Sequence, residues 1–233
     1  MNRADDDRSL SSENRLLLVL AEELKLPLLH VSQQTELYEQ THGISLDGIH
    51  ASTQHALLLI DSYVTLHTLR QQRLELEPVS VSSVLYETAR VLQPLAAQYH
   101  CKIALQIDGR YGPVMSHRAA LSAALVSMGT ALITAVKQPD QQVTLGVHRA
   151  QHNIVAGVFS STKGLGDKVL QQGRALYGRA RQPLQSFTPH PAAGVFIADD
   201  LLEMAGTQLR VAQHKNQRGL ATMLEPSRQL ALV

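Results

Sequence analysis

Two consecutive stretches of helical hydrophobic spacing, separated by a short glycine turn, most constrain what this chain can fold into. The first runs from Ser11 to His42 with Pro27 inside it, and the second from Ile49 to about Gln72. The positions of the two stripes recur at steps of three and four residues: Leu16, Leu20, Leu24, Pro27, Leu28 and Val31, then Ile49, Thr53, Ala56, Leu57, Ile60, Val64 and His67. This spacing predicts two helices that Gly43 joins into an antiparallel hairpin. A lone hairpin leaves helix faces uncovered, so we predict a homodimer in which two hairpins form a four-helix bundle.

After about residue 73 the pattern changes to short strands mixed with helices. Alternating apolar residues predict strands at 74–78, 102–108, 142–149, 152–160, 208–213 and 220–225. Helical spacing predicts helices at 80–98, 117–136 and 192–204. The predicted fold class is α+β, with antiparallel strands. The predicted division is a disordered acidic N-terminus (1–10), a helical hairpin (11–73), an α/β domain (74–226) and a C-terminal tail (227–233).

Composition limits the possible partners. The 233 residues carry a net charge of +1, so the chain has no general field to attract nucleic acid or an anionic membrane. Its longest apolar runs are far shorter than the ~20 residues of a membrane span, and the acidic N-terminus is unlike a signal peptide. The single cysteine, Cys101, cannot form an internal disulfide, and no cysteine and histidine cluster suits zinc. We expect a cytoplasmic protein without nucleic-acid, membrane or metal binding.

The first predicted helix contains the run Ala-Glu-Glu-Leu-Lys-Leu-Pro-Leu, residues 21–28. It resembles the Ser-His-Glu-Leu-Arg-Thr-Pro-Leu box of sensor histidine kinases. The order of elements from about residue 11 to 226 is similar to the catalytic core of that family, a dimerisation and phosphotransfer hairpin followed by a Bergerat-type ATP-binding domain. The resemblance places Glu22 at the phosphoacceptor histidine. A carboxylate does not supply the neutral imidazole nucleophile, so we expect no histidine autophosphorylation in this box and no catalytic residue.

The resemblance also implies changes at the nucleotide-binding positions. In the family, asparagines on one helix hold Mg²⁺ and phosphates, and Ala131 at such a position has no donor atom. The family's Asp-x-Gly-x-Gly box begins here with Ser160, and the last glycine-rich box keeps one glycine. The six positions of this degenerate nucleotide pocket are Ser127, Ala131, Ser160, Thr162, Gly164 and Gly194. Because four motifs differ while the apolar frame remains, we interpret the chain as a histidine-kinase fold without its chemistry, needing no cofactor.

The resemblance implies a function in two-component or phosphorelay signalling. The first hypothesis is a pseudokinase or scaffold that presents its hairpin to a response-regulator receiver domain or to a histidine kinase. Its predicted contact face consists of Glu22, Glu23, Lys25, Leu26 and Gln33. A second hypothesis is a divergent histidine kinase that still binds ATP and Mg²⁺ through backbone contacts. A third is a histidine phosphotransferase with a degenerate ATPase domain, for which His30 is the candidate acceptor.

Overall fold

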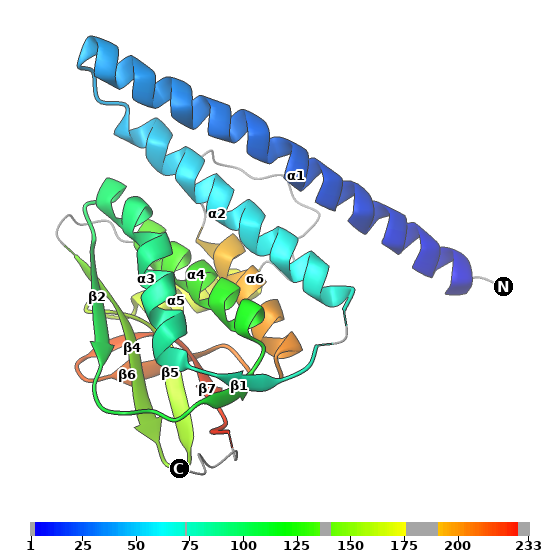
Figure 1. The fold of residues 1–233 in the computed structure, drawn as a ribbon, viewed down its shortest axis with the longest axis vertical. Helices are drawn as coiled ribbons and strands as arrows, with labels where there is room; N and C mark the ends of the chain where they lie inside the picture. The colour runs from blue at the N-terminus through cyan, green and yellow to red at the C-terminus, as the bar shows by residue number, and fades with distance from the viewer. Residues whose placement is uncertain (1–2, 73, 136–140, 176–190, 228–233) are drawn as a thin grey trace.

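A pair of long antiparallel helices forms the N-terminal part of the fold (Figure 1). The computed structural model describes residues 3–72, 74–135, 141–175 and 191–227. Helix α1 (Arg3–His42) ends at Gly43, whose φ of 67° turns the chain, and helix α2 (Asp47–Arg70) runs back along it. Helix α1 includes residues 3–10, in the segment 1–10 for which the sequence predicts a disordered N-terminus, and that division of the chain stays a prediction.

The face of α1 that packs on α2 differs from the predicted apolar stripe. The least exposed positions of α1 from residue 17 onward follow alternating steps of three and four residues: Leu18, Ala21, Lys25, Leu28, Ser32, Thr35 and Glu39. Leu20, Leu24 and Val31, which belong to the predicted stripe, are instead exposed. A one-residue offset rotates a side chain by about 100° around a helix, so the strongest apolar stripe of α1 lies beside the seam with α2.

A five-stranded mixed sheet forms the base of the C-terminal part. Its strands, in spatial order, are β2 (Lys102–Ile107), β4 (Gln142–Ala150), β5 (Asn153–Ser160), β7 (Gln217–Leu224) and β6 (Arg210–His214). Neighbouring strands are antiparallel, as predicted, except β2 and β4, which are parallel and differ from the prediction. A parallel pair needs a crossover connection, and β3 and α4, which separate β2 from β4 along the chain, supply it.

A separate two-stranded sheet pairs β1 (Glu77–Val79) with β3 (Val114–Ser116). The predicted strand at 74–78 therefore lies slightly further along the chain, and β3 was not predicted. Three residues carry too little alternation to indicate a strand, because β3 exists through pairing with a distant segment.

Helices cover one face of the main sheet (Figure 1). They are α3 (Val81–Gln98), α4 (Arg118–Ala135), α5 (Leu165–Ala175) and α6 (Ala192–Met204). Helices α3, α4 and α5 contact the strands, α6 packs against α4 and α5, and α2 lies across α3, α4 and α6. Helix α5 was not predicted because its segment is rich in glycine. Its apolar residues Leu165 and Val169, four positions apart, were the available signal.

The hydrophobic core is continuous between the hairpin and the layer of helices above the sheet. Leu58, Leu66 and Leu69 of α2 belong to the same buried cluster as the apolar residues of α3, α4 and α6. Helix α4 is long and apolar enough to cross a membrane, but 67% of it is buried inside the protein, as expected of a core helix. The predicted α+β fold class is confirmed, and the division of the chain near residue 73 stays a prediction.

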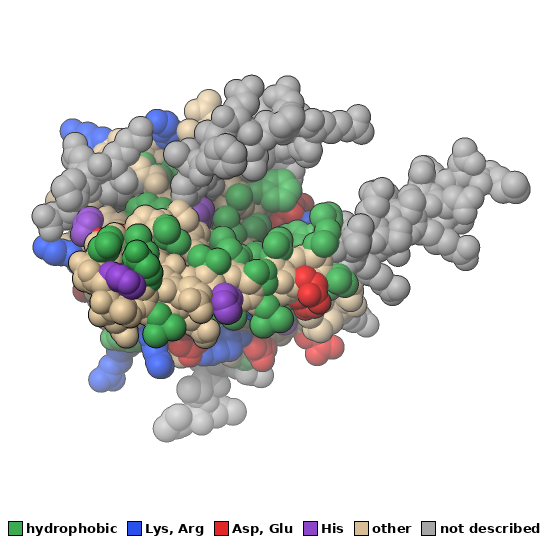
Figure 2. All heavy atoms as spheres, turned by 90° about the horizontal axis from the view of Figure 1, so that it is seen from above, with side chains coloured by type: hydrophobic (Ala, Val, Ile, Leu, Met, Phe, Trp, Pro, Cys, Tyr) green, Lys and Arg blue, Asp and Glu red, His purple; other side chains and the backbone are tan. Residues whose placement is uncertain are grey.

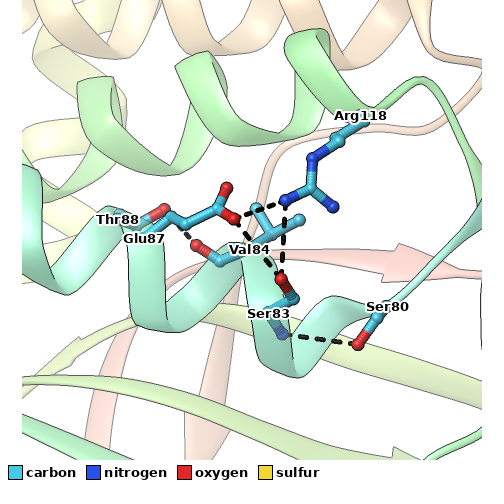
Figure 3. A network of polar contacts seen from close by, with 6 residues as sticks. All are labelled: Ser80, Ser83, Val84, Glu87, Thr88 and Arg118. Carbon is cyan, nitrogen blue, oxygen red and sulfur yellow. Dashed lines mark hydrogen bonds and ion pairs between the residues drawn. The ribbon is translucent and has the colours of Figure 1, made fainter.

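Polar contacts join the first turns of α3 and α4 at the surface (Figure 3). The hydroxyl of Ser80 accepts a hydrogen bond from the backbone N–H of Ser83 and caps α3. Arg118 at the start of α4 pairs with Glu87 at 2.5 Å and also donates to the hydroxyl of Ser83. Both charged side chains are about half exposed, so this pair contributes little to stability.

The shared core predicts that the hairpin and the sheet domain unfold together. We expect Leu66→Ala to lower the free energy of unfolding by about 2–5 kcal/mol, because Leu66 is 2% exposed and its truncation leaves a cavity. Leu26→Ala is the control, since Leu26 is 70% exposed and its loss should change stability by less than about 0.5 kcal/mol. Urea unfolding followed by circular dichroism measures both. Two separate transitions, with Leu66→Ala affecting only one, would contradict a shared core.

Candidate functional site

Three of the six predicted pocket positions lie together where α4 meets α6. Ser127 and Ala131 are one helical turn apart on α4 and are both buried. Gly194, near the start of α6, faces them: a Cβ atom added to it would lie 2.8 Å from the carbonyl oxygen of Ser127 and 3.4 Å from the Cβ of Ala131. The two helices are therefore in direct backbone contact at these positions.

The other three pocket positions follow one another where β5 ends and α5 begins. Ser160 is buried, and its hydroxyl accepts a hydrogen bond from the backbone N–H of Thr162 at 3.2 Å. The Thr162 hydroxyl in turn donates to the side-chain oxygen of Gln141 at 2.6 Å. Gly164 has a φ of 72°, a left-handed conformation that favours glycine, and α5 starts at the next residue. The side-chain hydroxyls of Ser160 and Thr162 are thus both used in hydrogen bonds within the protein.

The outer side of the α4–α6 contact is covered by α2. Arg70 at the end of α2 forms an ion pair with Asp200 of α6, whose side chain is 9% exposed. A hydrogen bond between two charged groups is stronger than one between neutral groups, so this pair helps to hold α2 over α6. Sequence reasoning missed Asp200, although a charged residue inside an otherwise apolar helical stretch is a visible signal.

The α4–α6 region offers few groups that could hold a metal or an anion. The hydroxyls of Ser127 and Thr130 are buried and have no hydrogen-bond partner among the described residues. Within those residues, no three histidine, cysteine, aspartate or glutamate side chains come together as metal ligands. Burial also lowers the pKa of His55 on α2, which disfavours its positive charge. Two neutral hydroxyls can bind water but supply neither the charge nor the ligand number that Mg²⁺ prefers.

The predicted contact face on α1 is mostly exposed. Glu22, Leu26 and Gln33 lie on one side of the helix within about 40° of each other, as their spacing implies. Glu23 is exposed further around the helix. Lys25 differs from the prediction: it lies in the seam with α2, where its ammonium group is 2.5 Å from a carboxylate oxygen of Asp61. Of the predicted contact face, Glu22, Leu26 and Gln33 thus share one exposed side of α1, with Glu23 at its edge, and their role in binding stays a prediction.

A second exposed surface of α1, which we term the apolar stripe, lies on the other side of the seam with α2. Its positions are Leu17, Leu20, Leu24, Pro27, Val31, Gln34 and Tyr38. None of these residues is charged, and five are large hydrophobic residues that are between 42% and 53% exposed. Figure 2 shows hydrophobic side chains gathered along the hairpin. An exposed apolar surface of this extent is typical of a protein-binding site.

Comparison with known proteins finds similarity in structure but not in sequence. No family model and no curated protein matches the chain. The structure of full-length ShkA in complex with AMPPNP is similar to 91% of this chain, with a TM-score of 0.52 and 16% identity. The chain spans 45% of the length of ShkA.

Two further histidine kinases match less well. AdeS of Acinetobacter baumannii has a TM-score of 0.49 at 11% identity, covering 87% of this chain and 96% of its own. The catalytic domain of ThkA has a TM-score of 0.46 at 11% identity, covering 66% of this chain and 96% of its own. ShkA is also a histidine kinase. Its similarity to this chain shows a histidine-kinase-like fold.

Direct contact between α4 and α6 predicts that Gly194 is required for packing. We expect Gly194→Ala to lower the free energy of unfolding by about 1–3 kcal/mol, because the new methyl group meets backbone that must move. The control is Gly48→Ala in the first turn of α2, where a Cβ has open space and alanine favours the helix. Thermal unfolding measures both variants. If the Gly194→Ala variant is as stable as the unmodified chain, there is open space between α4 and α6 at this position, and the inferred contact is wrong.

Proposed function

We propose that this chain is a signalling protein of the histidine-kinase type that acts through protein contacts and does not catalyse phosphotransfer. The observation that carries the proposal is the packing of Gly194 against Ser127 and Ala131. The resemblance to histidine kinases implies that metal and phosphates lie between these positions. Here the two helices touch, and the side chains at the site lack carboxylate or amide oxygens for Mg²⁺.

The position of Glu22 supports the same proposal. Glu22 is exposed on α1, at the place that the resemblance assigns to the phosphoacceptor histidine. A single carboxylate carries less charge and fewer acceptor oxygens than a phosphoryl group, so it is a weak substitute for phosphohistidine. We therefore assign Glu22 to a protein-contact face and not to chemistry.

The apolar stripe supports homodimer formation through a four-helix bundle. Each helix of such a bundle contacts two neighbours and therefore needs two seams. The first seam of α1 is occupied by α2, and the apolar stripe supplies a second with the same three- and four-residue spacing. A second copy of the hairpin matches this surface in length and polarity, and burying it removes large hydrophobic side chains from water.

The contact face and the apolar stripe lie on opposite sides of the α1–α2 seam, so both can be occupied at once. In the proposed dimer, Glu22, Leu26 and Gln33 remain accessible on each hairpin. Leu26, 70% exposed on the same side of α1 as Glu22 and Gln33, supplies an apolar anchor of the kind that dominates many interfaces. The resemblance implies a receiver domain or a histidine kinase as the partner that docks here.

The first experiment tests nucleotide binding by calorimetric titration with ATP, with and without Mg²⁺. We expect no heat of binding at millimolar ATP, and no protein-bound phosphate after incubation with labelled ATP and Mg²⁺. An active histidine kinase under the same conditions is the positive control. Micromolar binding would overturn the proposal in favour of a divergent kinase.

Phosphate accepted from a phosphorylated receiver domain, and lost in His30→Ala, would instead favour a phosphotransferase. His30 is exposed on α1, so the structure leaves it accessible for this test. His152→Ala is the matched control, because His152 is also exposed but lies in the turn between β4 and β5.

The second experiment separates the two surfaces of α1 with a matched pair of variants. Leu24 and Leu26 are both exposed leucines two positions apart, but they face different sides of the helix. We expect Leu24→Asp to weaken the dimer at least tenfold in sedimentation equilibrium, because a charge enters an apolar seam. Leu26→Asp should leave the dimer intact and abolish co-purification with the partner. Loss of the dimer in Leu26→Asp, or its retention in Leu24→Asp, would contradict the assignment of the two surfaces.

A further inference from the structure

The sheet curls at the end of β4, on the face opposite the helices. Strands β4 and β6 come into contact there although β5 and β7 lie between them in the sheet. The Nδ1 atoms of His148 on β4 and His214 on β6 are 3.0 Å apart. An ion pair at 2.5 Å between Asp108, which follows β2, and Lys215, which follows β6, joins the two edge strands at the same end.

An aromatic side chain and a glycine shape the site beneath the histidine pair. The ring of His214 stacks on that of Phe159, with centroids 5.0 Å apart, and Phe159 is completely buried. Gly146 lies under the same imidazole, because a Cβ there would be 2.9 Å from Nε2 of His214. The imidazole of His214 therefore packs directly over residue 146, where a side chain larger than that of glycine would meet it.

The hydrogen bond between the two imidazoles fixes where their protons lie. One Nδ1 must donate and the other must accept. Nε2 of His214 is buried and has no hydrogen-bond partner among the described residues, so a proton there would be an unsatisfied buried donor. We assign the donated proton to Nδ1 of His214 and the accepting lone pair to Nδ1 of His148. The other nitrogen of His148, which is only half buried, is then free to donate to water.

Protonation is incompatible with this arrangement. A proton on Nδ1 of His148 places two N–H groups against each other, unless His214 moves its own proton to the buried Nε2. Burial lowers the pKa of both histidines, and His148 and Lys215 lower that of His214 further by charge repulsion. Asp108 acts in the opposite direction on His214. The hydroxyl of Tyr111 also lies at this end of the sheet, 2.5 Å from the backbone oxygen of Asp108 and 3.0 Å from that of Val147.

We propose that the His148–His214 hydrogen bond is a proton-sensitive latch that holds the curled end of the sheet closed at neutral pH and opens when His148 takes up a proton. Opening separates β6 from β4 and exposes Phe159 and the apolar residues around it. This regulatory device lies on the sheet face opposite the helices and does not depend on the proposed signalling function.

The direction of the pH effect follows from the two protonation states. In the open or unfolded chain the histidines titrate near their ordinary pKa of 6.5, whereas in the closed pair they titrate at lower pH. Between these values the open form binds more protons, so the closed form loses stability as the pH falls below about 6.5. Above pH 7 both states hold neutral histidines, so protonation no longer disfavours the closed form.

Hydrogen–deuterium exchange of the full chain at pH 7.5 and pH 5.5, corrected for intrinsic rates, tests the latch. We expect exchange of the β6 amides to rise at least tenfold at pH 5.5. In His148→Gln this rise should disappear, because the glutamine oxygen accepts the same hydrogen bond and does not titrate. His152→Gln is the matched control, since His152 lies exposed in the turn that follows β4, and it should behave as the unmodified chain.

A rise that persists in His148→Gln, or its absence in the unmodified chain, would overturn the proposal. If His148→Gln does not fold, the histidine Cε1–H resonances of the unmodified chain decide. His148 and His214 should titrate at lower pH than His152 and with coupled curves. Independent titration of both near pH 6.5 would equally refute the latch.

Discussion

The packing of α2 across α4 and α6 is the contact on which the rest of the molecule depends. It places three leucines of the hairpin in the core of the sheet domain, and the ion pair between Arg70 and Asp200 fixes the end of α2 at the same place. Because one face of α2 is used in this way, α2 is the main neighbour of α1 among the described residues, and α1 presents its other faces outward. The packing of α2 on α4 and α6 thus determines which surfaces of α1 are available to partners, although none of the residues proposed to bind partners takes part in it.

Much of the fold could be predicted from local pattern. The two hairpin helices, α3, α4, α6 and the strands of the β4–β5 hairpin follow from three- and four-residue or alternating apolar spacing, because each has a buried face that the spacing records. Elements that depend on distant partners were missed or misjudged: β3 exists through pairing with β1, and the parallel pairing of β2 with β4 has no local signal. Likewise, the stripe of α1 was visible, but the sequence could not say that α2 takes the neighbouring face.

The candidate site shows where sequence reasoning reaches its limit. A small residue at a ligand-binding position and a small residue at a helix contact look identical in a sequence, and Ala131 and Gly194 are compatible with both. Only the spatial arrangement brings them together at backbone distance. The contact between His148 and His214 was even less predictable from the sequence. The two residues are 66 positions apart, and neither has a neighbouring motif that indicates the other. What joins them is the curl of the sheet, a property of all five strands.

The composition of the seam between α1 and α2 has a consequence for the behaviour of the hairpin. Four of its seven positions are polar, including Lys25 and Glu39, and the exposed ion pair between Lys25 and Asp61 contributes little. Long helices in water are stabilised mainly by tertiary packing of an apolar face, and the most apolar face of α1 is the one left uncovered. The packing of α1 against α2 is therefore stabilised by any partner that binds the apolar stripe, and this stabilisation grows with the partner's concentration. If the partner is a second copy of the chain, the helix content of the N-terminal part should rise with total protein concentration. The amount of this protein in the cell would then itself control how much of the hairpin is folded.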